Sequence, residues 1–135
     1  MGLAERRAVG EFQEKSFPAW AKKVNEAVGI DVKITVDWDK LAAPDYSHMY
    51  EDAFTKVYFT PLVDGLKEIC KDKMGKDALQ AALKEVIITN TKDYYYGDCW
   101  TFADGKITLD HSPISNIDNI DDRTKGLVAE LEKSL

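Results

Sequence analysis

The sequence has few cysteines and none of the spacing of a metal site. Its two cysteines, Cys70 and Cys99, lie far apart, and neither has the nearby Cys or His that a zinc site or a redox motif requires. Burial explains both better than reactivity, so we expect reduced, apolar side chains. The phosphate-binding glycine loop and the serine elbow of hydrolases are also missing. We therefore expect neither a metal nor a cofactor.

Long hydrophobic runs are missing too. The longest aliphatic run, Val86 to Ile88, falls far short of the ~20 residues that span a bilayer. The first residues mix Glu5 with Arg6 and Arg7, where a signal peptide has a basic stretch and then an apolar run. We therefore predict a soluble, cytoplasmic protein that does not bind a membrane.

Lysine and arginine are in the minority. The chain has 18 basic and 24 acidic residues and a net charge of -6, which argues against the clustered basic side chains of a nucleic-acid surface. The most acidic stretch, residues 110–122, contains Asp110, Asp118, Asp121 and Asp122 and no basic residue. Such a stretch is either a solvated loop or a docking surface for a cation or a basic partner.

The composition is otherwise that of an ordinary globular domain. With 135 residues, of which 44% are hydrophobic and 31% charged, the chain has the size and apolar content of one folded unit. No internal repeat and no linker rich in Pro, Gly or Ser divides it. We predict a single α+β domain over residues 1–135.

Proline and glycine mark the expected helix boundaries. Apolar spacing of three to four residues predicts helices in the N-terminal, central and C-terminal parts of the chain. Pro18 should divide the first into two segments that meet near Ser16, because proline lacks an N–H and clashes with the preceding turn. Thr60 and Pro61 favour the start of a new helix, and Gly75 favours its end.

Two further patterns predict strands. Apolar and polar residues alternate over 32–37, which is typical of a strand with one buried face. The run over 85–90 is apolar on both faces and predicts a central strand covered on either side. Because consecutive strands joined by short loops should pair antiparallel, we predict an antiparallel sheet of about four strands packed by the N-terminal, central and C-terminal helices. The four strands are 32–37, 85–90, 99–103 and 106–110.

The pair Asp104-Gly105 is the clearest local signal. It favours a two-residue type I′ turn between two strands. Counting outward from this turn places aromatic and aliphatic side chains on one side of the hairpin and threonines on the other. The expected pairs are Phe102 with Ile107, Thr101 with Thr108, and Trp100 with Leu109.

Three consecutive tyrosines precede this hairpin. Tyr94, Tyr95 and Tyr96 stand between Asp93 and Asp98, and side-chain alternation prevents all three rings from entering one core. At least one ring should be exposed; the rings either cover the end of the sheet or form a recognition surface, since interfaces are enriched in tyrosine. The tyrosines precede the hairpin and the acidic stretch follows it, so the two segments should lie side by side at the end of the hairpin opposite its turn.

The two histidines are the candidate acid-base residues. His48 and His111 alone titrate near neutrality without help from their surroundings. Asp110 precedes His111 just past the hairpin, where the end of a strand could present both. The candidate catalytic residues are therefore His48, Asp110 and His111, with surface or capping histidines as the alternative.

Two hypotheses of different classes follow. The first is a non-enzymatic protein–protein interaction or binding module that engages a protein with a basic surface. Its candidate binding residues are Tyr94, Tyr95, Tyr96, Asp98, Asp118 and Asp121. The second is a small-molecule-binding or hydrolytic enzyme lined by His48, Asp110 and His111, and it requires the two histidines to converge on one pocket.

Overall fold

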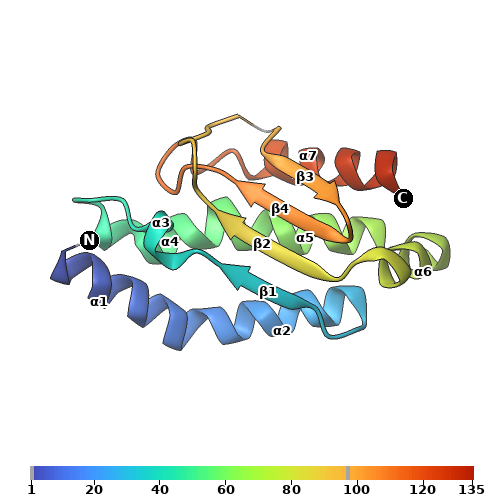
Figure 1. Cartoon of the computed structure of the whole chain (residues 1–135), viewed down its shortest axis with the longest axis horizontal. Coiled ribbons are helices and arrows are strands. Elements are labelled where there is room, and N and C mark those ends of the chain that lie inside the picture. The colour runs from blue at the N-terminus through green and yellow to red at the C-terminus, as the bar shows by residue number, and fades with distance from the viewer. Residues whose placement is uncertain (1, 97) are drawn as a thin grey trace.

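Four strands form one mixed sheet, and the long helices pack against a single face of it (Figure 1). The computed structural model describes residues 2–96 and 98–135. In chain order the elements are α1 (Leu3–Glu11), η1 (Phe12–Ser16), α2 (Phe17–Val28), β1 (Lys33–Val36), α3 (Trp38–Leu41), η2 (Ser47–Met49), α4 (Tyr50–Phe54), η3 (Thr55–Phe59), α5 (Thr60–Ile69), α6 (Lys73–Ala82), β2 (Glu85–Thr89), β3 (Trp100–Ala103), β4 (Lys106–Asp110) and α7 (Ile120–Ser134). The segments η1 and η3 are π-helical turns, and η2 is a 3₁₀ turn.

The sheet is mostly parallel, so the antiparallel sheet expected from the sequence is wrong. The strand order is β1-β2-β4-β3; β2 pairs parallel with β1 and with β4, and only β3 and β4 run antiparallel. The reason lies in the connections. Residues 37–84 form several helices between β1 and β2, which is enough chain to return to the starting end of the sheet. Residues 90–99 carry the chain past the position of β4, so β3 becomes an edge strand.

The strand β2 is central, as its apolar sequence indicated, but only one of its faces is covered by helices. Val86 and Ile88 are fully buried on the helix side, together with Ile107 and Leu109 of β4. Ile87 points to the opposite face and is half-buried. The prediction that both faces of β2 would be covered is therefore wrong. Side chains of the two neighbouring strands shield Ile87 in part, because β2 lies between them.

The hairpin of β3 and β4 has the register predicted from its turn. Asp104 has a φ of 54° and Gly105 a φ of 77°, and a type I′ turn requires positive φ at both positions. This register follows from the sequence because both strands are counted from the same two residues. The observed pairs are Trp100 with Leu109, Thr101 with Thr108, and Phe102 with Ile107.

Prolines widen two long helices instead of breaking them. The elements α1, η1 and α2 follow one another without a break, and so do α4, η3 and α5. Each π turn ends two residues before a proline, Pro18 in the first helix and Pro61 in the second. A proline ring clashes with the carbonyl four residues earlier, and the wider π turn makes room for it. The two segments expected to meet near Ser16 and the helix expected to start at Thr60 correspond to the starts of α2 and α5, but no break separates either helix from the π turn before it.

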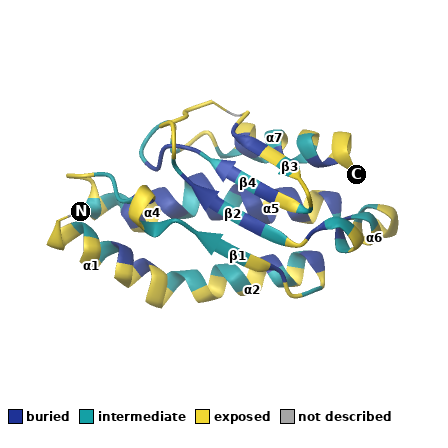
Figure 2. Cartoon of the chain, viewed as in Figure 1, coloured by how far each residue is buried: buried dark blue, intermediate teal, exposed yellow. Residues whose placement is uncertain are grey.

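An aromatic cluster joins these two helices to the end of β1. Phe12 of η1 stacks on Phe59 of η3 with ring centroids 5.7 Å apart, and it meets Phe54 edge-on at 5.2 Å. Trp38, directly after β1 and Asp37, lies 5.9 Å from Phe12. Both π turns thus contribute a ring to the core. Figure 2 shows that buried residues gather on α5 and on the central strands.

Gly75 does not end a helix, contrary to the prediction. It lies in the first turn of α6, where its N–H donates to Asp72 Oδ1 at 2.8 Å. A Cβ atom at this position would lie 1.9 Å from the carbonyl oxygen of Ile69. Glycine is required here because the end of α5 and the start of α6 approach too closely for a side chain.

Replacing Gly75 with alanine should lower the free energy of unfolding by about 1–3 kcal/mol, because the backbone at this corner must shift. Gly10→Ala is the matched control, since Gly10 also lies in a helix but a Cβ there meets nothing within 4 Å. That change should stabilise the protein by roughly 0.5–1 kcal/mol through helix propensity. Urea unfolding followed by tryptophan fluorescence measures both, and equal effects would contradict the close approach at Gly75.

Candidate functional site

The carboxyl ends of three strands meet at one edge of the sheet. Because β1, β2 and β4 are parallel, the residues that follow them lie together, and open α/β sheets bind ligands at this edge. Hydrogen bonds link these segments. The N–H of Asp37 donates to the carbonyl of Ile88 at 2.9 Å. The N–H of Thr91 donates to Asp110 Oδ1 at 2.8 Å, and the Thr91 hydroxyl donates to the other carboxylate oxygen.

All three tyrosines lie at this edge and are exposed. Tyr94, Tyr95 and Tyr96 expose 37%, 49% and 56% of their surface, so the prediction of at least one exposed ring is confirmed. The rings of Tyr95 and Tyr96 pack together, with centroids 4.3 Å apart and hydroxyl oxygens 3.0 Å apart. We call residues 91–96 the tyrosine loop.

The tyrosine loop is held by residues 110–122, which we call the acidic segment. The N–H of Ser112 donates to the carbonyl of Tyr94 at 2.7 Å. The side-chain amide of Asn116 donates to the carbonyl of Tyr95 at 2.6 Å. The two segments therefore lie side by side, as the sequence predicted, and these bonds fix the backbone of the loop while its rings face solvent.

The aspartates of the predicted binding set differ in their surroundings. Asp118 pairs with Lys56 at 3.1 Å, and Lys56 also pairs with Asp52 at 3.3 Å. The hydrogen bonds to these two carboxylates raise the pKa of Lys56. Asp98 and Asp121 are exposed and form no ion pair with any residue that the structure describes. The carboxylates of Asp98 and Asp121 are therefore available for contact with another molecule. The charge of Asp118 is partly neutralised by Lys56.

A buried arginine anchors the acidic segment. Arg123 is 1% exposed, and its guanidinium donates to the carbonyls of Asn116 at 2.7 Å and Ile117 at 2.6 Å. It also donates to the carbonyl of Lys56 at 3.3 Å, and the indole of Trp100 donates to the carbonyl of Arg123 at 2.9 Å. The side chain of Arg123 thus joins the acidic segment to η3, and its backbone carbonyl joins the start of α7 to β3. The sequence carries no signal for this role, because an arginine after two aspartates has the pattern of a surface residue.

The groups around Arg123 are kept neutral by burial. Desolvation raises the pKa of Tyr58 well above its usual value, and the Tyr58 hydroxyl donates to the carbonyl of His111 at 2.7 Å. Burial also raises the pKa of Cys99 to about 12. Burial lowers the pKa of Arg123 itself. Carbonyl oxygens rather than a carboxylate accept the hydrogen bonds of Arg123. We therefore interpret Arg123, Tyr58 and Cys99 as structural rather than catalytic residues.

The structure does not bring the two histidines together. His111 is fully buried; its Nδ1 lies 2.6 Å from the carbonyl oxygen of Ser112, and its Nε2 has no partner among residues 2–96 and 98–135. His48 is exposed and lines a groove of about 460 Å³ beside Ser16. Tyr58, which bonds to His111, lies ten positions after His48 along helical chain, a rise of about 15 Å.

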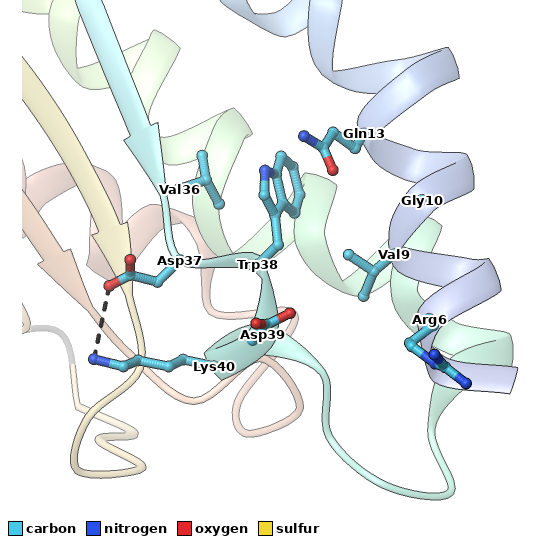
Figure 3. Close-up of a pocket in the computed structure, with 9 residues that line it drawn as sticks. All are labelled: Arg6, Val9, Gly10, Gln13, Val36, Asp37, Trp38, Asp39 and Lys40. Carbon is cyan, nitrogen blue, oxygen red and sulfur yellow. Dashed lines mark ion pairs between the residues drawn. The ribbon is translucent and has the colours of Figure 1, made fainter. Parts of the chain in front are cut away.

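A groove that the sequence did not reveal lies beside the carboxyl end of β1. It has a volume of about 570 Å³ and runs between α1 and the segment that joins β1 to α3 (Figure 3). The helix side of the groove is lined by Arg6, Gly10 and Gln13, and the opposite side by Trp38 and Asp39. Arg6 and Gly10 belong to α1 and Gln13 to η1; they recur at a spacing of three to four, which is one face of this continuous helix. A glycine within that face is the signal that could have marked it.

Comparisons with known proteins assign no function to this arrangement. No family model, no curated protein and no solved structure matches the chain. Within the described part of the chain, no three His, Cys, Asp or Glu side chains are grouped so that they could hold a metal ion. No helix there is long and apolar enough to cross a membrane.

Replacing Arg123 with leucine should lower the free energy of unfolding by about 2–4 kcal/mol, because buried carbonyls lose their donor. Amide hydrogen exchange should accelerate first at Ser112 and Asn119, whose N–H groups bond within this region. Arg7→Leu, on the exposed surface of α1, is the matched control and should change stability little. Uniform acceleration of exchange across the protein would contradict a local anchoring role.

The buried His111 should make stability depend on pH below about pH 7. Burial lowers the pKa of His111 below its usual value of 6.5, so the unfolded chain binds this proton more readily than the folded one. The contribution of neutral His111 to the free energy of unfolding is fully present above about pH 6.5. It falls as the pH drops toward the lowered pKa. The slope of the unfolding free energy should be positive in this range and cannot exceed about 1.4 kcal/mol per pH unit, the value for one whole proton.

The measurement is a series of urea midpoints across this pH range. His111→Phe should remove the slope, whatever its effect on stability at pH 7.5. His48→Gln is the control, in which the slope should persist because His111 is still present. A slope that survives in His111→Phe would show that another group is responsible.

Proposed function

We propose that this protein is a non-enzymatic binding module whose recognition surface is the tyrosine loop with the flanking acidic segment. Its partner is a protein that presents a basic surface. The observation that carries the proposal is the exposure of three successive tyrosine rings on a backbone held by hydrogen bonds from Ser112 and Asn116.

The fixed backbone supports binding because it lowers the entropic cost of association. A flexible loop must be ordered when it meets a partner, and that ordering opposes binding. Here the carbonyls of Tyr94 and Tyr95 already accept hydrogen bonds in the free protein. Tyrosine adds large contact area with few rotatable bonds, which is why recognition loops are rich in it.

The charges around the rings support a basic partner. The exposed carboxylates of Asp98 and Asp121 form no ion pair within the described residues, so they are available to lysine or arginine side chains. Tyrosine faces also attract cations, and the ammonium of Lys92 already lies 5.8 Å from the ring centre of Tyr94. A partner cation could use the same kind of contact on the other two rings.

The alternative of an enzyme lined by His48, Asp110 and His111 gains no support from the geometry. His111 is a buried residue of the acidic segment, and His48 lies in a separate groove, ten positions before the tyrosine whose hydroxyl bonds to His111. The carboxylate of Asp110 is engaged by Thr91. A substrate therefore has no common surface on which to meet the three side chains.

Replacing Tyr94, Tyr95 and Tyr96 together with serine should abolish capture of basic proteins from a lysate by the immobilised protein. Capture by the unaltered protein should fall steeply as salt is raised from 0.05 to about 0.5 M, because exposed charges are screened. Tyr46→Ser, which removes an exposed tyrosine from another part of the surface, is the control and should capture normally. Undiminished capture by the folded triple variant would refute the proposal.

A further inference from the structure

The groove between α1 and the carboxyl end of β1 has features that packing does not explain. Gly10 lies in the middle of its lining on α1, and a Cβ there would meet nothing within 4 Å. A glycine inside a helix normally reflects a close approach or a positive φ, and neither applies at this position. The missing side chain instead leaves the floor of the groove open.

The groove has an aromatic wall at one end. The half-buried indole of Trp38 faces α1, and the amide of Gln13 is directed toward it (Figure 3). Trp38 is held from behind by Phe12 and Phe17, with ring centroids 5.9 and 5.3 Å away. The ring is thus supported by the core, and one part of it faces the groove, which suits a flat apolar group.

The other end of the groove has one charge of each sign. Arg6 on α1 and Asp39 on α3 lie on opposite walls of this end (Figure 3), and no ion pair joins either of them to a described residue. Asp37 and Lys40, by contrast, already pair with each other at 3.9 Å. Arg6 and Gln13 are seven residues apart, so the groove extends about 10 Å along the helix.

We propose that this groove binds a small zwitterionic molecule with a flat apolar body, the class to which the aromatic amino acids belong. The ring lies over Gly10 against Trp38. The carboxylate faces Arg6, and the ammonium group faces Asp39. The position agrees with the general location of ligand sites beyond the carboxyl ends of parallel strands. This site is separate from the tyrosine loop and does not depend on the function proposed for that loop.

The test is a titration of the ¹⁵N-labelled full chain with L-phenylalanine, followed by NMR. Saturable shifts are expected at the amides of Gly10 and Gln13 and at the indole N–H of Trp38, with a dissociation constant on the order of 1 mM for so small a ligand. Phenethylamine lacks the carboxylate and 3-phenylpropionate lacks the ammonium group. Each should bind more weakly by up to about fivefold, the loss expected for one exposed ion pair.

Variants separate this groove from the rest of the surface. Gly10→Leu should fill the groove and abolish the shifts in an otherwise folded protein, whereas Ala19→Leu, on the exposed surface of α2, should bind normally. Arg6→Gln should weaken L-phenylalanine but leave phenethylamine unaffected, and Asp39→Asn should weaken L-phenylalanine but leave 3-phenylpropionate unaffected.

Several results would overturn the proposal. They are the absence of saturable shifts at the groove, equal affinity for all three compounds, and unchanged binding by Gly10→Leu. The test of the groove is independent of the test of the tyrosine loop. The triple serine variant of the tyrosine loop should bind L-phenylalanine normally. Conversely, Gly10→Leu should still capture basic proteins.

Discussion

The acidic segment keeps its place because one cation is buried beneath it. Arg123 could not be buried in an apolar core without hydrogen bonds, since desolvating a charge costs far more than packing returns. The carbonyls of Asn116, Ile117 and Lys56 accept hydrogen bonds from its two terminal nitrogens, whereas its Nε has no partner among the described residues, so the segment must adopt the path that brings its carbonyls inward. The backbone of the tyrosine loop is then fixed in turn, because Ser112 and Asn116 donate to it.

The parallel arrangement of β1, β2 and β4 brings the surfaces that we propose for binding to one edge of the molecule. The tyrosine loop follows β2, the acidic segment follows β4, and the groove of Trp38 follows β1. The first two segments bond directly to each other, and Asn90 of the loop after β2 donates to the carbonyl of Lys40 at 3.4 Å. An antiparallel sheet would have placed alternate segments at opposite ends. The topology therefore decides that these three segments lie at the same edge of the sheet.

The two π turns connect this edge to the helical layer. Each turn accommodates a proline and directs an aromatic side chain toward the other, which gives the contact between Phe12 and Phe59. Trp38 rests against Phe12, so the wall of the groove is supported by the same cluster that holds the helices together. The groove is consequently a feature of the packed core rather than of a loose surface segment.

The sequence by itself determined the features that local chemistry controls. The turn at Asp104-Gly105 set the hairpin register, alternation located β1, and three successive tyrosines had to expose at least one ring. Tertiary structure alone decided the parallel strand order, the burial of Arg123 and His111, and the groove lined by Gly10. The first group depends on residues that are neighbours in the chain. The second depends on contacts between distant segments, where the energy of burial overrides local preference, and no single segment carries that information.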